Sequence, residues 1–128
     1  MPATDEEGRY VPGPASTDGA ASDPDDFLVT TSSAAGAVTV QVRGELDIFT
    51  SPELDRWLRA ALAQSPDCVT LHMGGVRFID SSALAILVAC DRRALEAGSR
   101  LVIASPSPQV RRILDLVGLS EHLTVQAD

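Results

Sequence analysis

The sequence has few of the residues that build disulfide frameworks, metal sites or membrane spans. Two of its 128 residues are cysteines, Cys68 and Cys90, and they form neither a CxxC motif nor a set with histidines at metal-ligand spacing. No apolar run approaches the roughly 18 residues of a transmembrane helix, and the first residues are acidic where a secretory signal is basic. We therefore expect a cytoplasmic protein with no metal, no cofactor and no membrane contact, in which both cysteines are buried as small apolar residues.

Positive charge is also scarce. All ten basic residues are arginines, and eighteen acidic residues bring the formal net charge to −8. Direct contact with nucleic acid is not expected, because nucleic-acid binding depends on clustered cations that neutralise phosphates. A basic protein surface is the kind of partner that this charge favours.

Much of the acidity lies at the start of the chain, where residues 1–26 hold seven acids and one arginine. Only Tyr10 and Val11 bring bulky apolar side chains together in this segment, too few to offset the entropy lost on ordering. The length that remains suits one compact domain. The sequence predicts a disordered acidic tail over residues 1–26 and a single domain over residues 27–128.

Capping signals and apolar stripes predict three helices. Thr50 and Glu53 have the spacing of a capping box around Pro52, so we expect Thr50 to accept an amide hydrogen bond at the start of the first helix. The second helix follows Asp80-Ser81-Ser82 and is apolar on all sides at its start, which predicts a buried helix that ends at Gly98.

A third helix is expected after Ser107-Pro108, which supply a cap and a first-turn proline. Gly118 suits the left-handed position beyond its end. Runs rich in β-branched residues predict the strands, with Gly74-Gly75 closing the third run. The predicted strands are 27–31 and 38–42, joined as a hairpin by residues 32–37, and then 68–73, 100–104 and 123–125.

After the hairpin, strands and helices alternate along the chain. Short crossovers of this kind join parallel neighbouring strands. The sequence therefore predicts an α/β domain with a mixed sheet of four to five strands and helices packed on it.

Three stretches of the sequence resemble the STAS family, whose bacterial members include anti-sigma factor antagonists. These stretches are Gly44-Glu45-Leu46-Asp47, Phe78-Ile79-Asp80-Ser81-Ser82-Ala83-Leu84 and the segment from Ser107 to Leu119. Each motif alone is weak, but their order and spacing around the predicted elements favour the resemblance. The match spans residues 27–128.

The resemblance implies a non-enzymatic binding module that is switched by phosphorylation. In that family the serine directly after the motif's aspartate, here Ser81, is phosphorylated by a partner that is both an anti-sigma factor and a serine kinase with a histidine-kinase-like ATPase fold. The unmodified form binds this partner and frees a sigma factor, phosphorylation abolishes the binding, and a PP2C-type phosphatase restores it. Ser82 is a secondary candidate for the phosphate.

The resemblance also implies a partner-binding surface. Its expected residues are Glu45, Asp47, Asp80, Ser81, Ser82, Ala83 and Leu84. Ala83 stands where the family usually has glycine. We expect this change to matter in two ways, because alanine does not adopt positive φ cheaply and its methyl group would crowd a partner.

A serine at the start of a helix is physically suited to carry a switch. Unpaired amides and the positive end of the helix dipole lie there, so a phosphate of about −1.5 to −2 charges is tolerated by its own fold. The same charge and bulk would disturb a docked partner.

Plainer interpretations remain beside this one. Asp80-Ser81-Ser82 also fits an ordinary helix cap, and Gly44-Glu45-Leu46-Asp47 a strand-ending turn. A STAS module used as a constitutive adaptor or scaffold subunit would need no phosphorylation. An enzyme is the alternative of a different class, but paired carboxylates with a histidine, a nucleophile elbow and a phosphate-binding glycine loop are all missing.

Overall fold

The computed structural model describes residues 3–4, 10–11 and 26–126. Within residues 26–126 it is an α/β domain with one sheet and three helices. The strands of the sheet are β3 (Leu28–Ala34), β4 (Ala37–Leu46), β5 (Cys68–Ile79), β6 (Leu101–Ala104) and β7 (Thr124–Gln126). The helices are α2 (Ser51–Ala63), α3 (Ser81–Glu96) and α4 (Pro108–Leu116).

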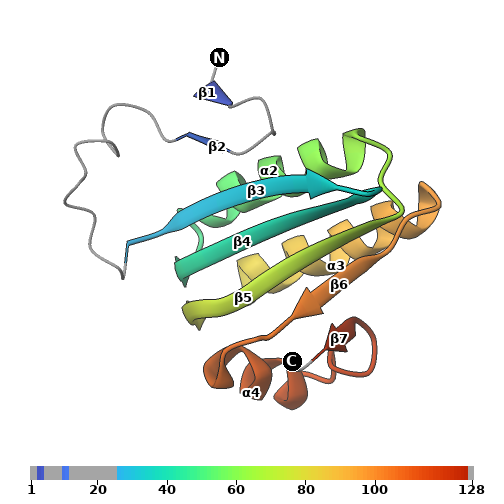
Figure 1. Ribbon diagram of the computed structural model, residues 1–128. Helices are drawn as coiled ribbons and strands as arrows, with labels where there is room; N and C mark the ends of the chain where they lie inside the picture. The colour runs from blue at the N-terminus through green and yellow to red at the C-terminus, as the bar shows by residue number, and fades with distance from the viewer. Residues whose placement is uncertain (1–2, 5–9, 12–25, 127–128) are drawn as a thin grey trace.

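The sheet has the strand order β3-β4-β5-β6-β7. The first pair is antiparallel and the other three pairs are parallel. Figure 1 shows α2 and α3 together on one face of the sheet, with α4 near the β6 and β7 edge. This confirms the predicted mixed sheet and the predicted order of elements after residue 26.

Two further short strands lie in the N-terminal segment. β1 (Ala3–Thr4) and β2 (Tyr10–Val11) pair antiparallel as a separate two-stranded unit, which the sequence did not predict. Residues 1–2, 5–9 and 12–25 lie outside the described residues. The disorder expected for the tail therefore stays a prediction.

The hairpin of β3 and β4 is longer and tighter than predicted. The strands pair from Leu28↔Arg43 to Ala34↔Ala37, so most of the expected loop 32–37 belongs to the strands. Ala35 and Gly36 alone form the turn, with φ of 52° and 81°. Positive φ at both central residues matches the twist of the flanking strands, which explains why two residues suffice.

β5 does not end at Gly74-Gly75, contrary to the prediction, but continues to Ile79. Its pairing with β4 slips twice, because Gln41↔His72 is followed by Arg43↔Gly75, and Gly44↔Val76 by Glu45↔Phe78. Each slip inserts one extra residue into β5, as in a β-bulge. The glycines therefore mark an irregularity inside the strand, which is one of their usual positions.

The core lies between the sheet and the helices. Alternate β4 residues Val38, Val40 and Val42 point into it, and their neighbours Thr39 and Gln41 lie on the opposite face. The helices contribute buried residues at spacings of three and four: Leu54, Leu58 and Ala61 from α2, Ala83, Leu87, Cys90 and Ala94 from α3, and Val110 and Leu114 from α4. In the described part of the chain, no helix combines the length and apolar character needed to cross a membrane.

The start of α4 confirms the predicted cap. The Ser107 hydroxyl accepts a hydrogen bond from the Val110 amide at 3.2 Å and donates one to the Val76 carbonyl at 2.6 Å. Gly118 has φ of 81° just beyond the helix, as expected. The cap thus also fastens α4 to the bulged part of β5.

Gly44, the first residue of the Gly-Glu-Leu-Asp motif, meets two backbone constraints. Its φ is 99°, and a Cβ atom at this position would lie 2.7 Å from the Phe27 Cα. Gly118 has a similar φ of 81°, but a Cβ there would meet nothing within 4 Å. A comparison of substitutions at Gly44 and Gly118 therefore separates the effect of backbone strain, present at both, from that of steric overlap, present only at Gly44.

We predict that Gly44→Ala lowers the free energy of unfolding by about 3 kcal/mol, because strain and overlap with the Phe27 backbone add. Gly118→Ala is the matched control and should lose about 1 kcal/mol, from strain alone. Urea denaturation of both variants and the wild type measures the difference. Equal losses in the two variants would show that the close approach to Phe27 is unimportant.

Candidate functional site

The predicted motifs meet where two parallel strands end. β4 ends at Leu46 and β5 at Ile79, and the Asp80 amide donates to the Leu46 carbonyl at 3.0 Å. The carboxyl ends of parallel strands lie at the same edge of a sheet. The Gly-Glu-Leu-Asp segment and the start of α3 are therefore brought together, although they are more than 30 residues apart in the chain.

Asp80 is the N-cap of α3. Its Oδ1 accepts hydrogen bonds from the Ser82 amide at 2.9 Å, the Ala83 amide at 3.2 Å and the Ser82 hydroxyl at 2.5 Å. The bond from the Ser82 hydroxyl, together with those from the backbone amides of Ala83, Ser82 and Ile48, lowers the pKa of Asp80 against the opposing effect of desolvation. The carboxylate form thus holds the first turn of the helix in place.

Ser81 is the first residue of α3, and its side chain is exposed. Within the described part of the chain, its hydroxyl has no hydrogen-bond partner. Asp80 already satisfies the two amides that follow, so the Ser81 hydroxyl takes no part in capping the helix. It lies at the surface of the domain.

Ser82 differs from Ser81 because its hydroxyl is held inward. It donates to Asp80, while the buried Ser51 hydroxyl donates to the Asp47 carbonyl at 2.6 Å. The two serine hydroxyls lie 3.3 Å apart, but each has a single proton that is already used. The Ser82 hydroxyl is therefore engaged inside the domain, whereas the Ser81 hydroxyl is exposed.

Asp47 organises the loop between β4 and α2, which corrects the prediction for Thr50. The Asp47 Oδ1 accepts from the Phe49 amide at 2.9 Å and from the Thr50 amide at 3.0 Å. The Thr50 hydroxyl donates to the Glu45 carbonyl and accepts from the Asp47 amide, and it makes no capping bond to α2. The expected capping box is therefore wrong, because the Thr50 backbone is already helical (φ −96°, ψ −23°) where a capping residue is usually extended, and its hydroxyl is used by Glu45 and Asp47.

Glu45 is exposed and forms an ion pair with Arg77 at 3.3 Å. The two residues extend from adjacent strands near the Asp80 edge. An exposed pair of this kind contributes little to stability. The Glu45 carboxylate therefore stays at the surface of the domain, and its part in partner binding stays a prediction.

The structure corrects what was expected of Ala83. Its side chain is completely buried in the core below α3, so its methyl group does not reach the surface. Its backbone is helical, and Ala83 is not among the residues with positive φ. Neither expected penalty of replacing glycine by alanine applies in this fold. Leu84 is half-buried and packs against the core.

Two exposed apolar residues beside the motif were missed by sequence reasoning. Ile48 is 65% exposed and Phe49 is 87% exposed, in the loop that Asp47 organises. The available signal was their position, since they lie between a strand end and a helix and outside the apolar stripe of α2. Large apolar side chains held in the open next to an exposed serine are typical of a protein-docking surface.

The described residues show no metal site and one deeply buried thiol. Among them, no group of three or more histidine, cysteine, aspartate or glutamate side chains is placed to hold a metal ion. Burial raises the pKa of the Cys90 thiol to about 11, which keeps it protonated and unreactive at neutral pH. Cys68 is only partly buried, which differs from the expectation that both cysteines lie in the core.

The whole domain matches known proteins. Residues 29–128 match the family model described as the STAS domain. The chain is 29% identical over 86 residues to the anti-sigma-B factor antagonist of Staphylococcus epidermidis, which covers 67% of this chain and 80% of that protein. It is 28% identical over 98 residues to the anti-sigma-F factor antagonist RsfB of Mycobacterium tuberculosis, which covers 77% of this chain and 80% of that protein.

A solved structure is similar over most of its length. The crystal structure of an anti-sigma factor antagonist from Mycobacterium paratuberculosis superposes with a TM-score of 0.74 at 27% identity. The alignment covers 84% of this chain and 91% of that one. The mixed sheet with helices packed on it is therefore shared with a protein of that name.

The charged cap makes stability depend on pH in a defined direction. The pKa of Asp80 in the folded chain lies below its ordinary value of 3.8, so the carboxylate stabilises the fold above that pH, and the contribution is lost as the pH falls through the folded-state pKa. Asp80→Asn keeps an acceptor for the helix amides but removes the charge. We predict that the wild type is more stable than Asp80→Asn at neutral pH and that the difference shrinks below about pH 4.

Urea denaturation between pH 7 and pH 3 measures this difference, because all other groups contribute equally to both proteins. Ser82→Ala removes the strongest of the bonds that lower the Asp80 pKa, and it should move the loss of stability to higher pH. A difference between wild type and Asp80→Asn that does not change with pH would rule out the charged cap.

Proposed function

The chain belongs to the STAS domain family, and on that basis we propose that it is an anti-sigma factor antagonist switched by phosphorylation of Ser81. The unmodified chain binds, in the cytoplasm, an anti-sigma factor that is also a serine kinase with a histidine-kinase-like ATPase fold, and a sigma factor is released. Phosphorylation of Ser81 ends this binding, and a PP2C-type phosphatase restores it. The single observation that carries the proposal is the exposed Ser81 hydroxyl at the start of a helix that Asp80 already caps.

The proposal requires a fold that tolerates the phosphate. Ser81 lies at the positive end of the 16-residue helix α3, where negative charge is favourable. Asp80 satisfies the amides of Ser82 and Ala83 by itself, so a phosphate on Ser81 displaces none of the bonds that hold the first turn. The modified chain should therefore keep its structure.

The proposal also requires a surface that the phosphate spoils. The Ile48 amide hydrogen-bonds to Asp80, the residue before Ser81. The same edge of the sheet carries exposed apolar side chains, Ile48 and Phe49, and the exposed acidic side chain of Glu45. Apolar anchors bind only when water is excluded from around them. A phosphate of about −1.5 to −2 charges at the edge of such a contact must be desolvated, and it repels any acidic group of the partner.

We predict that Ser81→Asp binds the cognate anti-sigma factor at least tenfold more weakly than the wild type, which is about 1.4 kcal/mol. Ser81→Ala is the control, because it should bind like the wild type but accept no phosphate. Titration calorimetry with the purified anti-sigma factor gives the affinities, and mass spectrometry after incubation with ATP gives the site of modification. Ser82→Ala should still be phosphorylated.

The constitutive adaptor is the second candidate, since the Asp80 cap by itself gives Asp80-Ser81-Ser82 a structural role. Equal affinities of wild type and Ser81→Asp, together with no phosphate on Ser81, would favour the adaptor. If Ser82→Ala loses the phosphate and Ser81→Ala keeps it, the phosphate is on Ser82 and the assignment of the switch to Ser81 is wrong.

We predict that Phe49→Ala weakens binding of the unmodified chain to the anti-sigma factor by about 2 kcal/mol, as truncation of an aromatic anchor does. Its stability should stay within about 0.5 kcal/mol of the wild type, because the side chain is 87% exposed. Leu116→Ala is the matched control, a 72% exposed apolar residue at the end of α4 that should leave the affinity unchanged. Similar affinities of Phe49→Ala and Leu116→Ala would remove Phe49 from the docking surface.

A further inference from the structure

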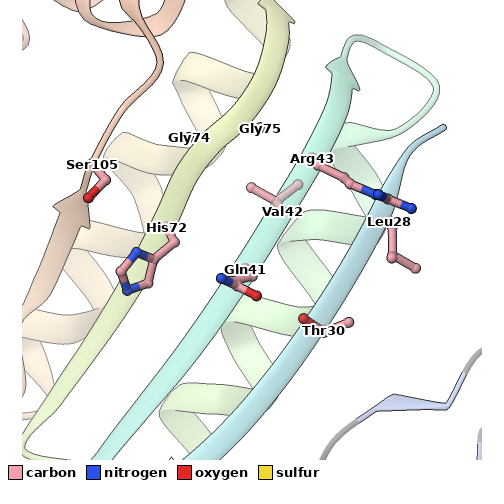
Figure 2. A pocket seen from close by; sticks show the side chains of 9 residues that line it. All are labelled: Leu28, Thr30, Gln41, Val42, Arg43, His72, Gly74, Gly75 and Ser105. Carbon is pink, nitrogen blue, oxygen red and sulfur yellow. The ribbon is translucent and has the colours of Figure 1, made fainter. Parts of the chain in front are cut away.

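The face of the sheet opposite α2 and α3 carries an open cavity of about 520 Å³. It lies over β3, β4 and β5 and is bordered by the segment after β6 (Figure 2). Its lining residues are Leu28, Thr30, Gln41, Val42, Arg43, His72, Gly74, Gly75 and Ser105. This volume falls within the range of small-molecule sites.

The strand register builds the cavity from two neighbouring rows. Thr30, Gln41 and His72 are paired across β3, β4 and β5, so their polar side chains form one row, as Figure 2 shows. The next row in the same direction contains Arg43 and Gly75, which are also paired. One row supplies hydrogen-bonding groups, and the other supplies the Arg43 cation beside a glycine, which has no side chain.

The two glycines keep the floor of the cavity open. A Cβ atom at Gly75 would lie 2.7 Å from the Arg43 Cβ, and one at Gly74 would lie 3.2 Å from the Ser105 carbonyl oxygen. Neither glycine has the positive φ that would by itself require glycine. Their role at this position is therefore to leave space next to Arg43.

Arg43 carries an unmet hydrogen-bonding group. Its Nε is buried and has no partner among the described residues. A buried donor without an acceptor destabilises the fold, because it has lost its hydrogen bonds to water without replacing them. None of the nine lining residues is acidic, although the chain has a net charge of −8. The cavity is thus lined by a guanidinium, an amide, a hydroxyl and an imidazole, and none of its lining residues is a carboxylate that could pair with the guanidinium.

We propose that this cavity binds an oxyanion, a carboxylate or phosphate group held by Arg43 and the row of Thr30, Gln41 and His72. A guanidinium pairs with such groups through two parallel hydrogen bonds. Two sources have this chemistry: a free small molecule, or the acidic side chains of residues 1–25, which precede the lining residue Leu28 in the chain. The site is separate from the Ser81 surface and does not depend on the proposed function.

The test uses the full chain and inorganic phosphate as the probe, at constant ionic strength. Two-dimensional ¹H–¹⁵N spectra follow the Arg43 Nε–H signal, the Gln41 side-chain amide and the backbone amides of Gly74 and Gly75. We expect saturable shifts at these positions. Arg43→Gln should weaken the binding at least tenfold, and Gln41→Ala, which changes an exposed side chain, should weaken it at least threefold.

Arg56→Gln is the matched control, since it removes the same charge from an exposed position on α2. A second chain with Asp18, Asp23 and Asp25 replaced by asparagine distinguishes the sources. Phosphate affinity that rises at least threefold in this chain assigns the site to the tail's own carboxylates, and unchanged affinity assigns it to a free ligand. The proposal is overturned if no saturable shift occurs in either chain, or if Arg43→Gln binds phosphate as well as Arg56→Gln does.

Discussion

The hydrogen bonds of the Asp80 carboxylate determine what the rest of the site can do. One oxygen receives two amides of the first turn of α3 and the Ser82 hydroxyl, so the helix begins at a fixed residue. Ser82 is drawn inward by this bond, and Ser81 is left outside. Because Asp80 already accepts hydrogen bonds from the helix amides, the exposed Ser81 hydroxyl is not needed to cap the helix. Two adjacent serines thereby acquire different chemical roles.

The Asp47 carboxylate fixes the loop between β4 and α2, as Asp80 fixes the start of α3. Asp47 holds the amides of Phe49 and Thr50, and the loop keeps Ile48 and Phe49 exposed beside the start of α3. Gly44 lets β4 pass close to the backbone of Phe27, which precedes β3. Gly44, Glu45 and Leu46 are the last residues of β4, so the turn of the plainer interpretation begins only at Asp47. The segment thus ends the strand and supports an exposed apolar surface.

Most features that depend on local chemistry, and the mixed sheet itself, could be predicted from the sequence, whereas the register between neighbouring strands could not. The Ser107 cap and the glycine after α4 were correct, because a cap needs only its own first or last turn. The Thr50 cap was wrong because the Thr50 hydroxyl bonds to the Glu45 carbonyl and the Asp47 amide instead of to an amide of α2. The continuation of β5 past Gly74, and the cavity around Arg43, follow from a register across several strands that no single stretch of sequence contains.

The central claim is that a negative group on Ser81 leaves α3 intact while it ends docking. Native-state hydrogen exchange of a chain carrying phosphoserine at position 81, compared with the unmodified chain, tests it most directly. Amides of α3 protected as well as before, or better because the phosphate lies at the positive end of the helix, are the predicted result. Loss of protection along α3 would mean that modification acts by unfolding the helix, and it would contradict the account.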